Sequence, residues 1–242
     1  MKAISKYSHR HFESLVKLLR QYEKRPGPET LHDVRVEIKK LKTLFHLANA
    51  SLKKFRMQKK FQPLRSVFKK AGAIRVADVN RGLEKTEVKE HTDPDVNPQR
   101  IAFRKATPGR IATVRRLDRK LRGPFRKIGK KDLLHYLKKT KSDVKVLLSP
   151  RFDREDLHPS RKKIKDILYL SQIADQKKPE PFYDKIQDVI GKWHDKQTLL
   201  ATLRLPEDRE EINKLKAESR DNISTIKKLI SGFYGRRDPK KK

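Results

Sequence analysis

The sequence predicts an all-α protein, and three observations support that prediction. Apolar residues recur at helical spacing along most of the 242-residue chain, and long alternating runs typical of half-buried strands are absent. The pattern is interrupted by short polar segments that contain proline, such as RPGPET at 25–30 and QKKPEP at 176–181. Apolar residues make up 35% of the chain, which is low but sufficient for a helical core.

These interruptions divide the chain into eight expected main helices. The first precedes the RPGPET break, and the second follows it with Thr30 as a candidate N-cap. The third runs from about residue 57 towards 90, a polar loop follows at 91–98, and the fourth helix ends at RGP, residues 122–124. The other four helices are expected at roughly 125–148, 155–175, 181–203 and 208–234.

The second helix carries two parallel series of side chains. The members of its apolar seam, which would face a bundle core, are Leu31, Val34, Ile38, Leu41, Phe45 and Ala48. The position after each of these is polar, and at about 100° per residue these positions share one narrow arc beside the seam. They are His32, Arg35, Lys39, Lys42, His46 and Asn49.

The same pattern occurs a second time, 126 residues later. The segment LHPSRKKIKDILYLSQI repeats the opening of LHDVRVEIKKLKTLFHL, and the places of His32, Arg35 and Lys39 are taken by His158, Arg161 and Lys165. The helices that follow also correspond, since one carries Gly72 and Asp78 and the other Gly191 and Asp195. The sequence therefore predicts two halves, 1–123 and 124–236, each a four-helix unit, followed by a disordered basic tail at 237–242.

The charge balance indicates the class of partner. The chain has 63 Lys and Arg against 30 Asp and Glu, a formal net charge of +33, with a pI near 10.4. Such a chain repels itself, which implies a polyanionic partner such as nucleic acid, another phosphate polymer or an anionic membrane. A linear phosphate polymer has no bases to stack or read, so a track of cations at helical spacing is enough to bind it.

The sequence lacks the residue patterns that several classes of protein require. The chain has no cysteine, which excludes disulfides and fits a reducing compartment such as the cytoplasm. No window is apolar enough to span a membrane, and the N-terminus has no secretory signal core. We find no P-loop, nucleophile elbow or paired catalytic carboxylates, and no carboxylate is expected to complete a metal set with the histidines at 9 and 11. We therefore expect no enzyme activity, no cofactor and no metal.

The two motif helices supply the first candidate binding residues. Arg35 and Arg161 are the expected anchors, since a guanidinium can hold two phosphate oxygens at once. The expected cation track comprises Lys39, Lys42, Lys162 and Lys165, and His32 and His158 are expected to orient or hydrogen-bond the ligand. The alternative is that these side chains bind no ligand and only extend from the edge of the core into solvent.

A second basic region, residues 100–131, has thirteen Lys or Arg and the single acid Asp118. Arg116 and Arg119 are its candidate binding residues, provided that they face the groove of the motif helices. Asp78 and Asp195 are expected to hold motif cations in position, and Gly72 and Gly191 to permit close helix approach.

An LH-x-x-R-x-x-x-K helix used twice, each followed by a helix with glycine and then an arginine or histidine near aspartate, resembles the CHAD family, the conserved-histidine α-helical domain. The resemblance covers nearly the whole chain. It implies two four-helix bundles related by pseudo-twofold symmetry, with a basic groove or channel that binds inorganic polyphosphate without catalysis. It also implies targeting to polyphosphate granules, and it adds Arg75 to the binding residues.

Two other functions remain alternatives. A nucleic-acid-binding protein would be served equally well by the net charge. Single-strand binding usually adds exposed aromatics, and duplex recognition usually shows a groove-reading motif, and we see neither; Trp193 is expected to pack in the core. A phosphohydrolase would need clustered acids for divalent metals, which the sequence lacks.

Overall fold

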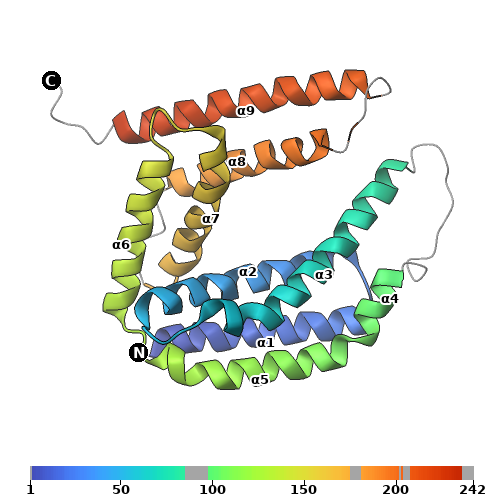
Figure 1. Ribbon diagram of the computed structural model, residues 1–242, viewed down its shortest axis with the longest axis vertical. Coiled ribbons are helices and arrows are strands. Elements are labelled where there is room, and N and C mark those ends of the chain that lie inside the picture. The colour runs from blue at the N-terminus through green and yellow to red at the C-terminus, as the bar shows by residue number, and fades with distance from the viewer. Residues whose placement is uncertain (1, 85–97, 175–180, 202, 204–207, 236–242) are drawn as a thin grey trace. The chain divides into compact units, whose positions relative to one another are not determined.

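The computed structural model describes residues 2–84, 98–174, 181–201, 203 and 208–235, with side chains in the third helix only as far as Ile74 (Figure 1). Every regular element in these ranges is an α-helix, which confirms the all-α prediction. The nine helices are α1 (Lys2–Lys24), α2 (Pro28–Ser51), α3 (Met57–Glu84), α4 (Pro98–Lys105), α5 (Thr107–Arg126), α6 (Lys130–Leu147), α7 (Arg154–Ser171), α8 (Pro181–Leu200) and α9 (Arg209–Gly235).

The chain forms two compact units, Met1–Leu133 and Leu134–Lys242. The first contains α1 to α5, and the second contains most of α6 together with α7 to α9. One motif helix lies in each unit, α2 in the first and α7 in the second. The pseudo-twofold relation between the halves remains a prediction.

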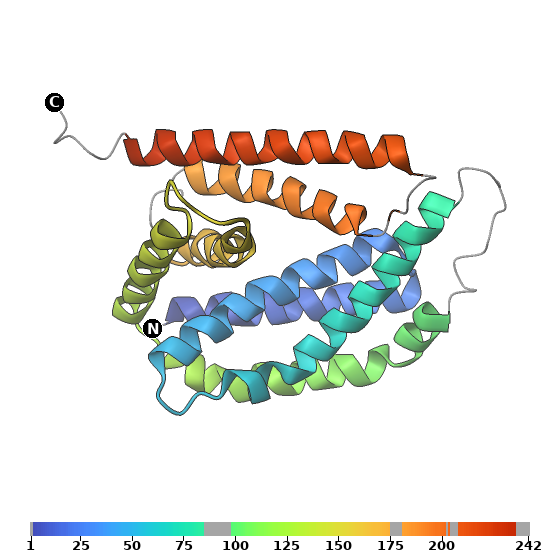
Figure 2. The same cartoon turned by 45° about the horizontal axis from the view of Figure 1, so that its top comes forward.

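In the first unit the helices pack as a closed ring. α1 lies along both α2 and α5, α2 lies along α3, and α3 packs on α4 and α5 (Figures 1 and 2). The whole predicted apolar seam of α2 is buried, and the ring of Phe45 makes edge contacts with Phe55, Phe61 and Phe125 at centroid distances of 5.1 to 5.9 Å. Burial of these large apolar side chains stabilises the unit and fixes the rotation of α2, so the polar series beside the seam lies at the edge of the bundle.

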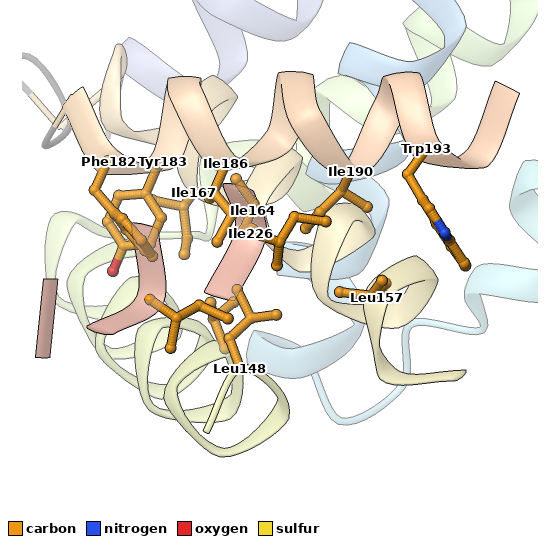
Figure 3. Packing of buried hydrophobic residues seen from close by; sticks show 12 residues of the cluster. Leu148, Leu157, Ile164, Ile167, Phe182, Tyr183, Ile186, Ile190, Trp193 and Ile226 are labelled. Carbon is orange, nitrogen blue, oxygen red and sulfur yellow. The ribbon is translucent and has the colours of Figure 1, made fainter. Parts of the chain in front are cut away.

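In the second unit α8 packs along both α7 and α9. Figure 3 shows the core that results, in which Ile164 of α7, Ile186 of α8 and Ile226 of α9 come together. Trp193 belongs to this cluster, so its predicted place in the core is confirmed. The phenyl rings of Phe182 and Phe233 stack at 3.8 Å between centroids.

The expected fourth helix begins where predicted but is wrong in its continuity and its end. Within the described residues it is two helices, α4 and α5, that break at Ala106. Pro108 accounts for the break, because it has no N–H for the carbonyl of Arg104 and its ring crowds that carbonyl. The helix then continues past its expected end to Arg126, with Pro124 inside its last turn.

The expected N-cap of α2 is also wrong. The helix begins at Pro28, with Gly27 as its N-cap in an extended conformation, and Thr30 is buried in the first turn. Proline suits the first helical position because its φ angle is already helical and its missing N–H would have no partner there. Of the loop expected at 91–98, Pro98 is instead the first residue of α4, and residues 91–97 and the tail at 237–242 lie outside the described residues. A search of the described helices finds none that is both long and apolar enough to cross a membrane.

Candidate functional site

Arg35 lies on the flank of α2 that faces α3. Its guanidinium carbon is 4.3 Å from the centre of the Phe68 ring, and Nη1 donates a hydrogen bond of 3.4 Å to the carbonyl of the same residue. The guanidinium lies directly over Gly72, where an added Cβ would overlap Nη1. The motif arginine is therefore half-buried across α3 rather than extended into solvent.

Arg161 has the same arrangement in the second unit. Its Nε donates a hydrogen bond of 3.3 Å to the carbonyl of Gln187 in α8. The guanidinium lies over Gly191, where an added Cβ would be 2.7 Å from Nη2 and 3.3 Å from the guanidinium carbon. Both motif arginines thus cross the next helix at a glycine.

The geometry explains why each crossing needs glycine. In both units the carbonyl that accepts the hydrogen bond belongs to the residue four positions before the glycine, Phe68 before Gly72 and Gln187 before Gly191. A helical side chain leans towards the N-terminus and covers the preceding turn, so any Cβ at the glycine would cover the place of the guanidinium. The expected close approach is therefore made by an arginine side chain on the helix.

The other motif residues of the first unit flank this crossing. His32 is exposed, whereas Lys39 and Lys42 are half-buried on the same side of α2 as Arg35. Arg75 and Asp78 follow Gly72 on α3, but their side chains lie outside the described part of the structure. The predicted roles of these two residues remain predictions.

The motif histidine of the second unit has a different setting. His158 is half-buried, and its Nδ1 is buried without a hydrogen-bond partner in the described part of the chain. Its ring centre is 4.7 Å from that of His194, which lies three residues after Gly191. Burial lowers the pKa of His158, and the nearby positive groups lower it further, in the order Lys162, His194, Arg161 and Lys165. These basic groups are therefore close enough to His158 to act on its charge.

Asp195 follows His194 and is exposed. No hydrogen bond or ion pair in the described residues joins it to Arg161, so its role in positioning a motif cation is still a prediction.

On its opposite flank, each motif helix is joined to the preceding helix by hydrogen bonds and ion pairs that the sequence did not predict. In the first unit the carboxylate of Glu37 is 2.6 Å from His11 Nδ1 of α1 and accepts a hydrogen bond of 2.7 Å from Lys40. Burial alone would raise the pKa of Glu37, but the hydrogen bonds and charges of these two partners outweigh it and hold the pKa below its usual value. The glutamate is thus a buried anion with two partners.

In the second unit, the motif helix is joined to the preceding helix by side chains of the opposite charge. At the shift of 126 residues, Glu37 corresponds to Lys163 and Lys40 to Asp166. The Tyr136 hydroxyl of α6 donates a hydrogen bond of 2.9 Å to Asp166, and Lys163 Nζ is 2.7 Å from the Asp143 carboxylate. Reversed charges therefore serve the same structural purpose.

The acid of the basic region is buried. Asp118 has an exposed fraction of 4%, and its Oδ2 is 2.9 Å from His9 Nδ1 and 3.1 Å from Arg122. The expectation that no carboxylate joins the N-terminal histidines is therefore wrong, because the fold brings Asp118 to His9. Ligand atoms of His9, Glu13 and Asp118 lie within 4.8 Å of one another, as a metal set would require. The guanidinium of Arg122 already bonds the same carboxylate oxygen, which disfavours a cation there.

Arg116 and Arg119 are exposed on α5. This helix packs mainly along α1, whereas Arg35 lies over α3. The structure therefore does not bring the two candidates of the basic region to the motif arginine.

The comparisons with known proteins agree with the duplicated motif. No curated protein and no solved structure matches the chain. The family model described as the CHAD domain matches residues 9–204, which include both motif helices and both glycine crossings. A match over this much of the chain establishes the family, and the protein belongs to the CHAD domain family.

Proposed function

We propose that this protein binds inorganic polyphosphate, without catalysis, through the motif residues of α2 and α7 and the helices that they cross. The observation that carries the proposal is the arginine held over glycine in both units, with further cations beside it on the same flank. A chain with a net charge of +33 needs a polyanion to offset its self-repulsion. Membership of the CHAD family favours polyphosphate as that polyanion.

The chemistry of the crossing suits a phosphate chain. A guanidinium has five N–H donors, and the hydrogen bond described for Arg161 uses one of them. Packing against α8 restricts the side chain before any ligand arrives, so less conformational entropy is lost on binding. Lysines three and four residues apart on a helix lie about 5 to 6 Å from one another and can follow an extended polyanion.

The exposure of the aromatic residues argues against a single-stranded nucleic acid as the preferred ligand. No phenylalanine, tyrosine or tryptophan side chain within the described ranges is exposed, and the ring of Phe68 is covered by Arg35. Single-strand binders usually stack bases on exposed aromatic rings. Polyphosphate has no bases, so it loses nothing from the absence of such rings among the described residues.

The proposed role is that of a binding protein in the cytoplasm, targeted to polyphosphate granules. The motif surfaces offer cations and imidazoles, and the buried carboxylates Glu37 and Asp166 lie on the opposite flanks of their helices, each held by its own partners. This arrangement suits retention of the ligand. Phosphate release from polyphosphate with Mg²⁺ or Mn²⁺ would contradict the non-enzymatic part of the proposal.

The direct test is a competition at matched salt. Long-chain polyphosphate is added to the protein bound to labelled RNA or DNA, and the reverse displacement is measured at the same concentration of phosphate charge. We expect polyphosphate to displace nucleic acid at the lower charge concentration. If nucleic acid displaces polyphosphate instead, the proposed ligand is wrong.

A further inference from the structure

A second cationic surface lies on α5. The exposed side chains of this helix include six cations and no acid: Arg115, Arg116, Arg119, Lys120, Arg122 and Arg126. Four of them recur at intervals of four, three and four residues and so lie along one flank of the helix. We call these four the arginine row; its members are Arg115, Arg119, Arg122 and Arg126.

Three of the four charges of the arginine row are not neutralised within the described part of the chain. The one acid of α5, Asp118, is buried and takes its contacts from His9 and Arg122. The other three members of the row make no hydrogen bond or ion pair in the described residues. By contrast, the half-exposed Lys163 of the second unit pairs with Asp143. Like charges three and four residues apart on a helix repel each other, so the row is destabilising unless an external anion covers it.

The row and the motif arginine face different sides of the first unit. Arg122 extends towards α1, where its guanidinium is 3.4 Å from His9 Nδ1. Arg35 lies on the other side of the ring of helices, where α2 meets α3. Figure 1 shows α1 between α2 and α5, and α1 packs along both of them. A polymer segment on one surface therefore leaves the other accessible.

We propose that the arginine row is a second binding surface for a linear phosphate polymer, so that one chain of this protein holds two polymer segments and bridges them. The inference rests on the proposed function for its ligand class. The row spans about 16 Å at a rise of about 1.5 Å per residue, and its four guanidiniums can each hold two phosphate oxygens. Binding on two sides turns a polymer-binding protein into a cross-linker of polymers, and it raises avidity for long chains.

The test compares two triple variants of the full chain. The row variant is Arg115→Gln with Arg119→Gln and Arg126→Gln; Arg122 is kept because it holds Asp118. The control is Arg220→Gln with Lys227→Gln and Lys228→Gln, which removes the same charge from exposed positions on α9. Calorimetry with a short polyphosphate of defined length counts oligomers bound per chain. Energy transfer between donor-labelled and acceptor-labelled long polyphosphate reports bridging.

The row variant should bind one oligomer fewer than the wild type and lose most of its energy transfer, whereas the control should match the wild type in both. Glutamine is a good helix former, so circular dichroism should show the same helix content in all three proteins. Equal stoichiometry and transfer in the row variant and the wild type would overturn the inference while leaving the proposed function intact. A wild type that binds no oligomer would overturn both. A row variant that loses RNA binding alone would make the row a nucleic-acid surface and overturn the inference.

Discussion

The two motif helices make the same contacts with the helix that follows them and different contacts with the helix that precedes them. Towards the next helix, Arg35 and Arg161 lie over a glycine and donate to the carbonyl four residues before it. Towards the preceding helix, the first unit uses a buried glutamate and the second a buried aspartate, with the charges exchanged along the motif. A structural tie needs only complementary partners, so either polarity serves. The arginine crossing needs one particular pair of residues, and both units have it, which is what a common ligand would require.

The two histidines of the motif differ as well. His32 is exposed, whereas His158 is half-buried, faces His194 and has its pKa lowered by burial and by nearby cations. The duplicated sequence thus places its two motif histidines in different environments. Changes made in one unit and then in the other can separate the shared function from the local structure.

The largest expected effect comes from removing both crossing arginines. Arg35→Ala with Arg161→Ala should weaken polyphosphate binding by about 100-fold, because hydrogen bonds to charged groups are worth about 1.5 to 3 kcal/mol each. Binding is measured at fixed salt by calorimetry. The control removes the same charge from the tail with Arg236→Ala and Arg237→Ala, and equal losses in the two variants would show that net charge alone determines binding.

The next largest effect concerns the stability that Glu37 gives the first unit through His11 and Lys40. Glu37→Gln should lower the free energy of unfolding by about 2 kcal/mol at pH 7, because His11 and Lys40 lose a buried anionic partner. The folded pKa of Glu37 lies below its usual 4.5, so its contribution is present above that pH and is lost as the pH falls through the folded pKa. Urea unfolding at pH 7 and pH 3 measures both. Glu13→Gln, an exposed change on α1, should have almost no effect, and a pH-independent loss would contradict the assignment.

The smallest effect is the pH dependence of binding at the second unit. A polyanion would offset the repulsion that Lys162, Arg161 and Lys165 exert on His158, and so raise its pKa on binding. Binding then takes up a proton, and affinity should rise as the pH falls through the window from the bound pKa down to the lowered free value. The gain is a few-fold, since a full pKa unit would give about tenfold. His158→Asn should flatten the profile more than His32→Asn; identical profiles for wild type and His158→Asn would refute the linkage.

The parts of the fold that follow from local patterns could be predicted from the sequence. The apolar seam of α2 is buried as its spacing predicts, and the helix count fails only where Pro108 divides one expected helix into two. The spacing of the duplicated motif identified Arg35, Gly72, Arg161 and Gly191 as special positions. That each arginine rests on its glycine is a contact between two helices, and spacing within one helix cannot reveal it. The same holds for the pairing of Asp118 with His9, which are 109 residues apart.

The most direct test of the account moves the arginines without changing the charge. In Gly72→Ala with Gly191→Ala, each new methyl group takes the place of a guanidinium, while helix propensity favours alanine by about 1 kcal/mol. Gly123→Ala with Gly232→Ala is the matched control, because a Cβ at either position meets no atom within 4 Å. Calorimetric titration with polyphosphate at fixed salt should show about tenfold weaker binding for the crossing variant and wild-type binding for the control. Wild-type affinity in a folded crossing variant would contradict the claim that arginines held over glycine are the phosphate anchors.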